Sequence, residues 1–225
     1  VRNNTIKHTL ENVLATGEVV INMVTYDMVQ QTSLASCEFP KEVNEFVKAG
    51  FTPLASEIVK PFRVQESPVN LECKLLQVIE TGQEGGAANL IICEVIKMHI
   101  NDAILDEVGQ IDPHKIDLVG RMGQDFYCRA SGDADFEVPK PNLDLGLGFD
   151  ALPESIRNST ILSGNDLGML ANSTRIPVVT EVIDDEQLQQ IMRDYGPHPD
   201  ALRTVLHRYA KALLARHEVA RAWQV

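Results

Sequence analysis

The sequence predicts a mainly β domain over residues 1–130, followed by a linker and a helical extension over residues 131–225. The strongest signal is a long antiparallel hairpin. Apolar and polar side chains alternate over residues 69–79, a glycine-rich turn follows at 82–86, and residues 89–100 return as a second strand. Strands and helices do not alternate regularly in this part of the chain, which argues against a doubly wound sheet. After residue 130 the pattern changes to turns rich in Gly, Pro and Asp, and then to amphipathic helices.

The chain is expected to begin with a short helix. Ile6, Leu10 and Val13 fall on one side of this helix, and Gly17 follows where a glycine commonly ends one. Further elements are expected around the hairpin: a buried strand at 18–24, helices at 26–35 and 41–49, a turn or short helix starting at Asp112, and a last strand at 125–129.

The first strand of the hairpin is expected to have one face in the core and one face in water. Its alternation places two sets of side chains on opposite faces. The apolar set is Val69, Leu71, Cys73 and Leu75, and the polar set, expected to face solvent, is Asn70, Glu72 and Lys74.

Composition excludes several classes of protein. Lys and Arg number 20 against 32 Asp and Glu, a formal net charge of −12. Such a surface repels phosphate backbones, so no nucleic-acid partner is expected. No apolar stretch approaches the roughly 18–20 residues of a membrane helix, so no membrane partner is expected either. The cysteines form no C-x-x-C pair and lie in apolar runs, which predicts buried free thiols and a cytoplasmic location: Cys37, Cys73, Cys93 and Cys128.

The extension is expected to be helical. Helices are predicted at about 153–159 and 163–172, then a third capped by Asp184 and Asp185, and a last one after Pro199. In the last helix an apolar stripe lies opposite a basic side formed by Arg203, Arg208, Lys211, Arg216 and Arg221. This basic side is expected to pack against an acidic surface of the same or a partner subunit, with a binding site for another molecule as the alternative.

Three familiar patterns of functional residues carry no chemistry here. Residues 146–151 spell G-x-G-x-x-A, but Asp144 and Asp150 would place carboxylates beside a pyrophosphate, and no βαβ unit surrounds the segment. No Ser lies in a G-x-S-x-G elbow. Two sets of residues lack the spacing of metal sites and are expected to be ordinary surface groups, so no metal is predicted: His99, Asp102 and Asp106, and Asp112, His114 and Asp117.

The segment Lys7-His8-Thr9 is the strongest candidate for ligand binding that the residues themselves provide. It lies in the first turn of the opening helix, where unpaired backbone N–H groups and the positive end of the dipole favour an anion. Lysine adds a mobile charge and threonine a hydroxyl donor. Together they predict a site that can hold one phosphate group, although Lys and Thr are also common at helix starts without a ligand.

Several short segments between residues 5 and 130 match those of a known family in the same order. They are KHTLEN at 7–12, TGEVVIN at 16–22, FP…EF…AGFT within 39–52, RV…ESPVNLEC within 63–73, GRMG at 120–123 and FYCR at 126–129. This ordered series resembles the flavin reductase-like, FMN-binding split-barrel proteins. Residues 152–157 and 162–168 resemble the extension of a longer subgroup of that family.

The resemblance implies a Greek-key split β-barrel that forms a homodimer, with FMN near the subunit interface. It implies an FMN-dependent oxidoreductase, namely an NAD(P)H:flavin reductase with NADH or NADPH as the electron donor. Two alternatives stay open. One is a flavoredoxin-like electron carrier, which keeps FMN bound and exchanges electrons with a protein. The other is a non-catalytic FMN-binding or interaction protein.

The resemblance also implies which residues bind the cofactor. Lys7 and Thr9 are expected to contact the FMN phosphate, with His8 between them at a position where the family usually has an acidic residue. Phe46 is expected near the cofactor on a covering loop.

No catalytic residue is named, because hydride passes from nicotinamide to flavin when the two rings stack, and the protein supplies position and electrostatics. Arg121 and Tyr127 match the family pattern, with a packing role as the alternative. The early barrel strands that the family carries before residue 5 are expected to be missing from this chain.

Overall fold

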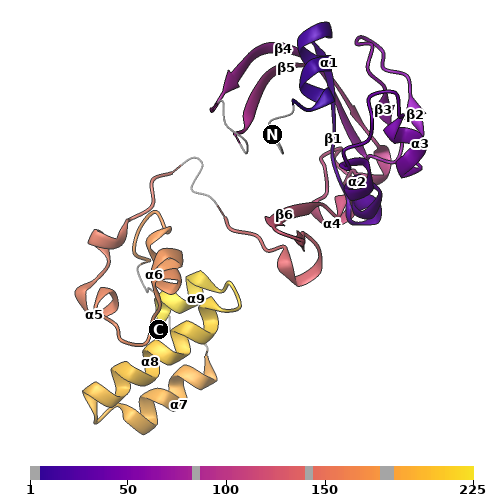
Figure 1. Ribbon diagram of the computed structural model, residues 1–225. Coiled ribbons are helices and arrows are strands. Elements are labelled where there is room, and N and C mark those ends of the chain that lie inside the picture. The colour runs from indigo at the N-terminus through magenta and orange to yellow at the C-terminus, as the bar shows by residue number, and fades with distance from the viewer. Residues whose placement is uncertain (1–5, 83–86, 140–143, 178–184) are drawn as a thin grey trace. The chain divides into compact units, whose positions relative to one another are not determined.

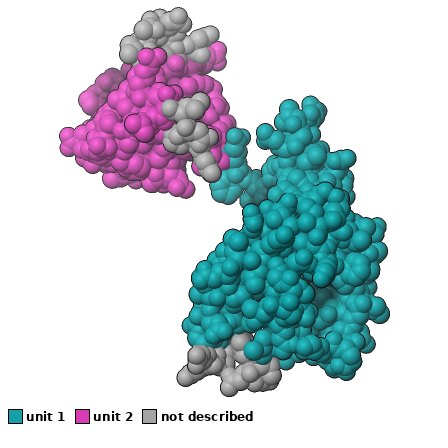
Figure 2. All heavy atoms as spheres, turned by 90° about the horizontal axis from the view of Figure 1, so that it is seen from above, with its two compact units in different colours: residues 1–137 teal, residues 138–225 magenta. Residues whose placement is uncertain are grey.

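The computed structural model divides the chain into two compact units, Val1–Glu137 and Val138–Val225, which Figure 2 draws in different colours. The sequence pattern placed this boundary between residues 130 and 131. The structure describes most of both units, namely residues 6–82, 87–139, 144–177 and 185–225 (Figure 1).

A three-stranded antiparallel sheet forms the centre of the first unit. Its order is β1 (Glu18–Asn22), β4 (Val69–Glu80) and β5 (Asn89–Ile100), so β4 is hydrogen-bonded on both sides. The pairing of β4 with β5 runs from Val69 opposite Ile100 to Glu80 opposite Asn89. The predicted hairpin is therefore confirmed, except for residues 83–86 of its turn, which lie outside the described residues.

Short elements surround this sheet. The first helix, α1 (His8–Thr16), ends as predicted at Gly17, which adopts the left-handed conformation at φ 67° that glycine reaches without strain. Helix α3 (Glu45–Ala49) is shorter than expected because the Asn44 side chain caps it by accepting a hydrogen bond from the Phe46 amide. The others are η2 (Tyr26–Met28), α2 (Val29–Ala35), β2 (Pro53–Leu54), β3 (Arg63–Val64), η3 (Asp102–Ile104), α4 (Pro113–Ile116), β6 (Val119–Gly123), β7 (Phe126–Arg129) and η4 (Gly132–Ala134).

The prediction that the polar face of β4 is solvated is wrong for two of its three residues. Lys74 is exposed, but Asn70 is only 5% exposed and Glu72 is 0% exposed. The face is covered because the segment 57–59 donates its backbone amides to the Glu72 carboxylate. A buried carboxylate is stable there because its hydrogen-bonding capacity is filled.

The expectation of four buried thiols is also only partly correct. Cys73 is buried and Cys93 is half-buried, whereas Cys37 and Cys128 are exposed. Cys37 follows the end of α2, and Cys128 lies on the short hairpin formed by β6 and β7, where no third strand covers it among the described residues.

Among the described residues of the second unit, five α-helices follow η5 (Phe149–Ala151). They are α5 (Glu154–Arg157), α6 (Gly164–Ala171), α7 (Glu186–Tyr195), α8 (Pro199–Leu214) and α9 (Val219–Gln224). Figure 1 shows α7 and α9 beside α8, which supplies Tyr209, Ala210, Leu213 and Leu214 to the buried core of this unit. Asp185 caps α7 as predicted, while Asp184 lies outside the described residues.

The single last helix expected after Pro199 is instead two helices. The chain leaves α8 after Leu214 and turns at His217, whose φ of 60° is incompatible with a right-handed helix. This turn lets Ala222 and Trp223 of α9 pack back onto the core that α8 forms.

The prediction of a mainly β fold is not confirmed. Helices account for 40% of the structure and strands for 22%, and no closed barrel is present among the described residues. Helix exceeds strand largely because the second unit is helical, and short helices also separate the strands of the first unit. Within the described ranges, no helix is both long enough and apolar enough to span a membrane.

Candidate functional site

The first turn of α1 carries the residues predicted to hold a phosphate. Lys7 is the N-cap in an extended conformation, and its side chain forms no capping hydrogen bond. The amides of Leu10 and Glu11 donate to the Lys7 carbonyl at 2.9 and 3.3 Å, which leaves the amides of His8 and Thr9 without an acceptor among the described residues. The Lys7 and Thr9 side chains are exposed and His8 is half-buried. This corner can therefore receive an anion.

One carboxylate lies close to this corner. Glu11, in the same first turn, accepts a hydrogen bond from the Lys41 ammonium at 2.7 Å. That hydrogen bond and the charge of Lys41 lower the pKa of Glu11. Because Lys41 offsets the charge of Glu11, the positive end of the helix and the ammonium of Lys7 remain suited to a phosphate. The residues present thus fit the phosphate end of FMN.

Phe46 lies in a different part of the same unit. It lines a cavity of about 240 Å³ whose walls come from β1, η2, α2, α3, β3 and residues next to them: Asn22, Val24, Met28, Thr32, Ala35, Glu45, Phe46, Phe51 and Val64. Gln31 fixes α3 in place because its side-chain amide donates to the carbonyls of Ala49 and Gly50 at 3.0 and 3.1 Å. No described residue of α1 lines this cavity, so the structure does not bring Phe46 together with Lys7, His8 and Thr9.

A second cavity contains the two residues that match the family pattern near the end of the first unit. Arg121 and Tyr127 line it, together with residues of η2, α2, β6 and β7, and its volume is about 400 Å³. Arg129 has a structural role. Its guanidinium forms two hydrogen bonds to Asp117 at 2.7 and 2.6 Å, and its central carbon lies 3.8 Å from the centre of the Tyr26 ring. Arg121 forms no ion pair with any described residue and donates to the Gln124 carbonyl at 3.0 Å.

A buried polar cluster surrounds Glu72, and the residue pattern did not predict it. Its carboxylate accepts hydrogen bonds from the amides of Glu57, Ile58 and Val59 at 2.8, 2.7 and 3.0 Å, and lies 2.6 Å from Nε2 of His99. Burial by itself would raise the pKa of Glu72, but these hydrogen bonds lower it to about 2. His99 was expected at the surface and instead bridges Glu72 to Glu57, which also pairs with Lys97.

The polar residues of the ESPVN segment have a similar structural role. The Ser67 hydroxyl lies 2.8 Å from the carbonyls of both Met23 and Val69. The Asn70 side-chain amide donates to Oδ1 of Asn22 at 2.8 Å, and the same oxygen accepts the Val64 amide at 3.0 Å. These residues hold β3 and the chain before β4 against β1, so they build the scaffold of the unit.

Metal-type clusters are not found within the described ranges, where no three His, Cys, Asp or Glu residues are arranged to hold an ion. Three carboxylates of the two candidate sets bond to the backbone or to an arginine. Asp106 accepts the amides of Val108 and Gln110, Asp112 caps α4, and Asp117 pairs with Arg129.

The chain is similar to a known protein family and to several curated proteins. A family model described as flavin reductase like domain matches residues 3–113. An uncharacterized protein of Aquifex aeolicus (strain VF5) is 38% identical over 135 residues, which cover 60% of this chain and 67% of the relative. The chain spans between about half and two thirds of the length of the curated relatives that it matches.

Two solved structures share the fold of about three fifths of this chain. Nitrilotriacetate monooxygenase component B from Bacillus cereus aligns with a TM-score of 0.55 at 24% identity, over 61% of this chain and 68% of that one. A flavin reductase-like protein with a split barrel domain from Shewanella frigidimarina NCIMB 400 aligns with a TM-score of 0.52 at 28% identity, over 59% of this chain and 65% of that one.

Proposed function

The chain belongs to the flavin reductase-like domain family, and from this we propose that it is an FMN-dependent oxidoreductase, an NAD(P)H:flavin reductase. The observation that carries the proposal is the open first turn of α1, which lies within the matched residues 3–113 and offers Lys7 and Thr9 to an anion. The proposal includes NADH or NADPH as the electron donor and a homodimer as the functional form. The likeness to split-barrel structures supports it at the level of the fold.

In this proposal the first turn of α1 orients the cofactor. The Lys7 ammonium and the Thr9 hydroxyl bind the phosphate, together with the free amides of the turn. FMN supplies the hydride-accepting chemistry, so the protein needs no acid–base pair of its own for that step. Phe46 remains a proposed contact for the apolar part of the cofactor, supported by the apolar cavity that it lines.

Replacing Lys7 by alanine tests the phosphate site. A charge-assisted contact of this kind is worth about 1–3 kcal/mol, so Lys7→Ala should weaken FMN binding by roughly fivefold to 150-fold in a fluorescence titration. Lys74→Ala, which removes an exposed lysine of β4 that lies opposite Glu18, just beyond the C-terminal end of α1 and not at its first turn, is the matched control and should leave the dissociation constant unchanged. Equal FMN affinity of the two variants would remove Lys7 from the site.

Oxidation of NADH and NADPH with added free FMN tests the activity. Turnover of free flavin supports a reductase. Reduction of bound FMN by a protein donor, without turnover of free flavin, would instead show a flavoredoxin-like carrier. If the protein binds FMN but neither NAD(P)H nor a protein donor reduces the bound flavin, it is a non-catalytic FMN-binding protein. If it does not bind FMN at all, the whole proposal is refuted.

A further inference from the structure

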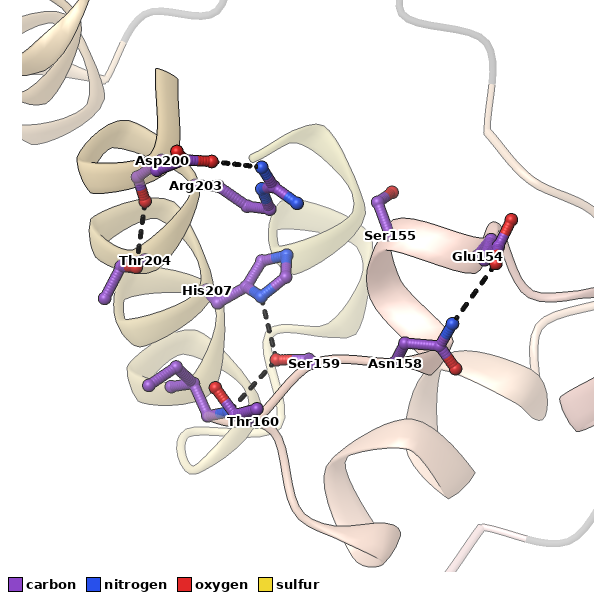
Figure 3. A pocket seen from close by; sticks show the side chains of 10 residues that line it. Glu154, Ser155, Asn158, Ser159, Thr160, Asp200, Arg203, Thr204 and His207 are labelled. Atoms are coloured by element: carbon purple, nitrogen blue, oxygen red, sulfur yellow. Dashed lines mark hydrogen bonds and ion pairs between the residues drawn. The ribbon is translucent and has the colours of Figure 1, made fainter. Parts of the chain in front are cut away.

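The second unit contains a hollow that the flavin chemistry does not use. It lies between α5 with the segment 158–161 and the N-terminal half of α8, and its volume is about 540 Å³ (Figure 3). Its walls are mostly polar and consist of Glu154, Ser155, Asn158, Ser159, Thr160, Ile161, Asp200, Arg203, Thr204 and His207. The size is within the range of small-molecule sites, which hold a few convergent polar groups.

Hydrogen bonds around Ser159 fix the state of His207. The Ser159 hydroxyl oxygen accepts the amides of Ile161 and Leu162, both at 3.1 Å, and these bonds occupy its two lone pairs. Its proton is therefore donated to Nδ1 of His207, 2.8 Å away. A ring that accepts at Nδ1 is neutral and carries its proton on Nε2. Burial, followed by the charge of Arg203, lowers the pKa of His207, which agrees with a neutral ring.

Three hydrogen-bond donors consequently line this hollow, with Arg203 and His207 on α8 and Ser155 on α5 (Figure 3). In Figure 3 the second ring nitrogen of His207 points away from Ser159, toward the space between Arg203 and Ser155. The Arg203 guanidinium uses one N–H for Asp200, at 2.6 Å, in an i,i+3 pair whose acidic side chain is 97% exposed. Its other N–H groups and the Ser155 hydroxyl have no acceptor among the described residues. An exposed pair of this kind holds Arg203 only weakly.

An apolar hollow adjoins this polar one. It has a volume of about 310 Å³ and shares three lining residues with the first, namely Ser155, Arg203 and His207. The rest of its wall is almost entirely apolar and consists of Ile156, Leu162, Leu170, Pro199, Leu202, Leu206, Ala210, Ala222, Trp223 and Val225. The three donors thus stand at the boundary between a polar and an apolar space.

From this juxtaposition we propose that the second unit binds a small organic carboxylate with an apolar body. The carboxylate is bound by the guanidinium of Arg203, Nε2–H of His207 and the hydroxyl of Ser155, and the body fills the hollow beside Leu206 and Trp223. Charge decides the orientation. The two carboxylates of the polar hollow, Glu154 and Asp200, do not line the apolar one, whereas all three donors line both.

The 225-residue chain provides its own reporter for this site, because Trp223 is its only tryptophan and lines the apolar hollow. Octanoate and 3-phenylpropionate are the probes for a linear and an aromatic body. 1-Octanol has an apolar body without the charge, and acetate has the charge without the body. Titration with either acid should change Trp223 fluorescence saturably, and acetate should have no effect at the same concentrations.

Arg203→Gln should weaken the binding of the acid about tenfold or more, because a charged hydrogen bond is lost. It should leave the weaker binding of 1-octanol unchanged. Arg193→Gln, on α7 and outside both hollows, is the matched control and should bind octanoate as the natural chain does. Circular dichroism establishes that both variants are folded. Leu206→Phe, which fills the apolar hollow, should weaken both probes.

Two outcomes would overturn the proposal. The first is the absence of any saturable response to both acids. The second is equal affinity for octanoate and 1-octanol that Arg203→Gln does not alter, since the hollow would then be a non-specific apolar cavity with no carboxylate site.

Discussion

Glu72→Gln is expected to destabilise the first unit more than any change to an exposed carboxylate. Oε1 of Glu72 accepts the Glu57 amide and contacts His99, while Oε2 accepts the amides of Ile58 and Val59. A glutamine can keep its oxygen toward Ile58 and Val59 and turn its NH₂ group to His99, but the Glu57 amide then loses its acceptor. One unsatisfied amide costs about 1–3 kcal/mol, and the retained bonds lose their charge assistance, so we expect a total of about 2–4 kcal/mol.

Amide hydrogen exchange is the direct assay, because it reads the opening of residues 57–59 individually. In Glu72→Gln these amides should exchange faster by the factor that corresponds to this free energy, and urea unfolding followed by far-UV circular dichroism should show a lower midpoint for the first unit. Glu66→Gln is the control, because the exposed Glu66 carboxylate accepts only the Thr52 amide among the described residues. Unaltered protection of residues 57–59, or an equal effect of both variants, would refute the reasoning.

Acid should reproduce the effect in the natural chain. The pKa of Glu72 is about 2 in the folded protein and 4.5 as an unperturbed group. A group whose folded pKa is depressed contributes stability that is fully present above the unfolded pKa and is lost as pH falls through the folded one. Protection of residues 57–59 should therefore be constant above about pH 5 and decline between pH 4.5 and 2.

Three further predictions concern Asp185 and the cysteines. Asp185→Asn should destabilise the second unit by about 2–4 kcal/mol in denaturation followed by Trp223 fluorescence. The reason is that the Asp185 carboxylate accepts hydrogen bonds from the Tyr209 hydroxyl at 2.6 Å and from Arg221 at 2.8 Å, and also caps α7. An effect no larger than that of Asp194→Asn, on the exposed end of α7, would contradict this. The pKa of Asp185 is about 2, against 3.8 for the unperturbed group, so its contribution should fade only as pH falls below about 4. An aromatic disulfide reagent should label the exposed thiols of Cys37 and Cys128 rapidly, and the buried thiol of Cys73 only after unfolding. Equal labelling rates for all three thiols would contradict the burial of Cys73.

The elements that the sequence predicted correctly are those whose signal is local. The alternation in residues 69–79 and 89–100 reflects the two-residue repeat of a strand, and Gly17 ends α1 because the left-handed conformation there suits a residue without a side chain. The capping box of α6 is equally local, as Ser163 and Asp166 each bond the backbone at the other's position. Such signals need no knowledge of distant contacts.

The buried state of Glu72 could not be predicted because it depends on chain that is distant in sequence. A two-residue alternation shows that Glu72 and Cys73 lie on opposite faces of β4, but it does not show what covers each face. Glu72 is covered by the segment 57–59, which has no regular secondary structure and therefore no pattern of its own. An acidic residue in a run of apolar residues was the only signal, and solvent exposure explains such a residue equally well.

The proposed site was predictable to a similar, limited extent. The residues of α1 are consecutive, so sequence alone places Lys7, His8 and Thr9 in one turn. Phe46 was linked to them only by resemblance, and the structure places it on α3 in a separate cavity.

The two ligand sites proposed for this chain can be tested independently because they lie in different compact units. Lys7 is in the first unit, whereas Arg203 and the fluorescent Trp223 are in the second. Loss of FMN binding in Lys7→Ala should therefore leave the octanoate response of Trp223 intact, and Arg203→Gln should leave the FMN dissociation constant intact. If either substitution changed the affinity for both ligands, the two units would be thermodynamically coupled. In that case FMN and octanoate should each change the affinity for the other by the same factor.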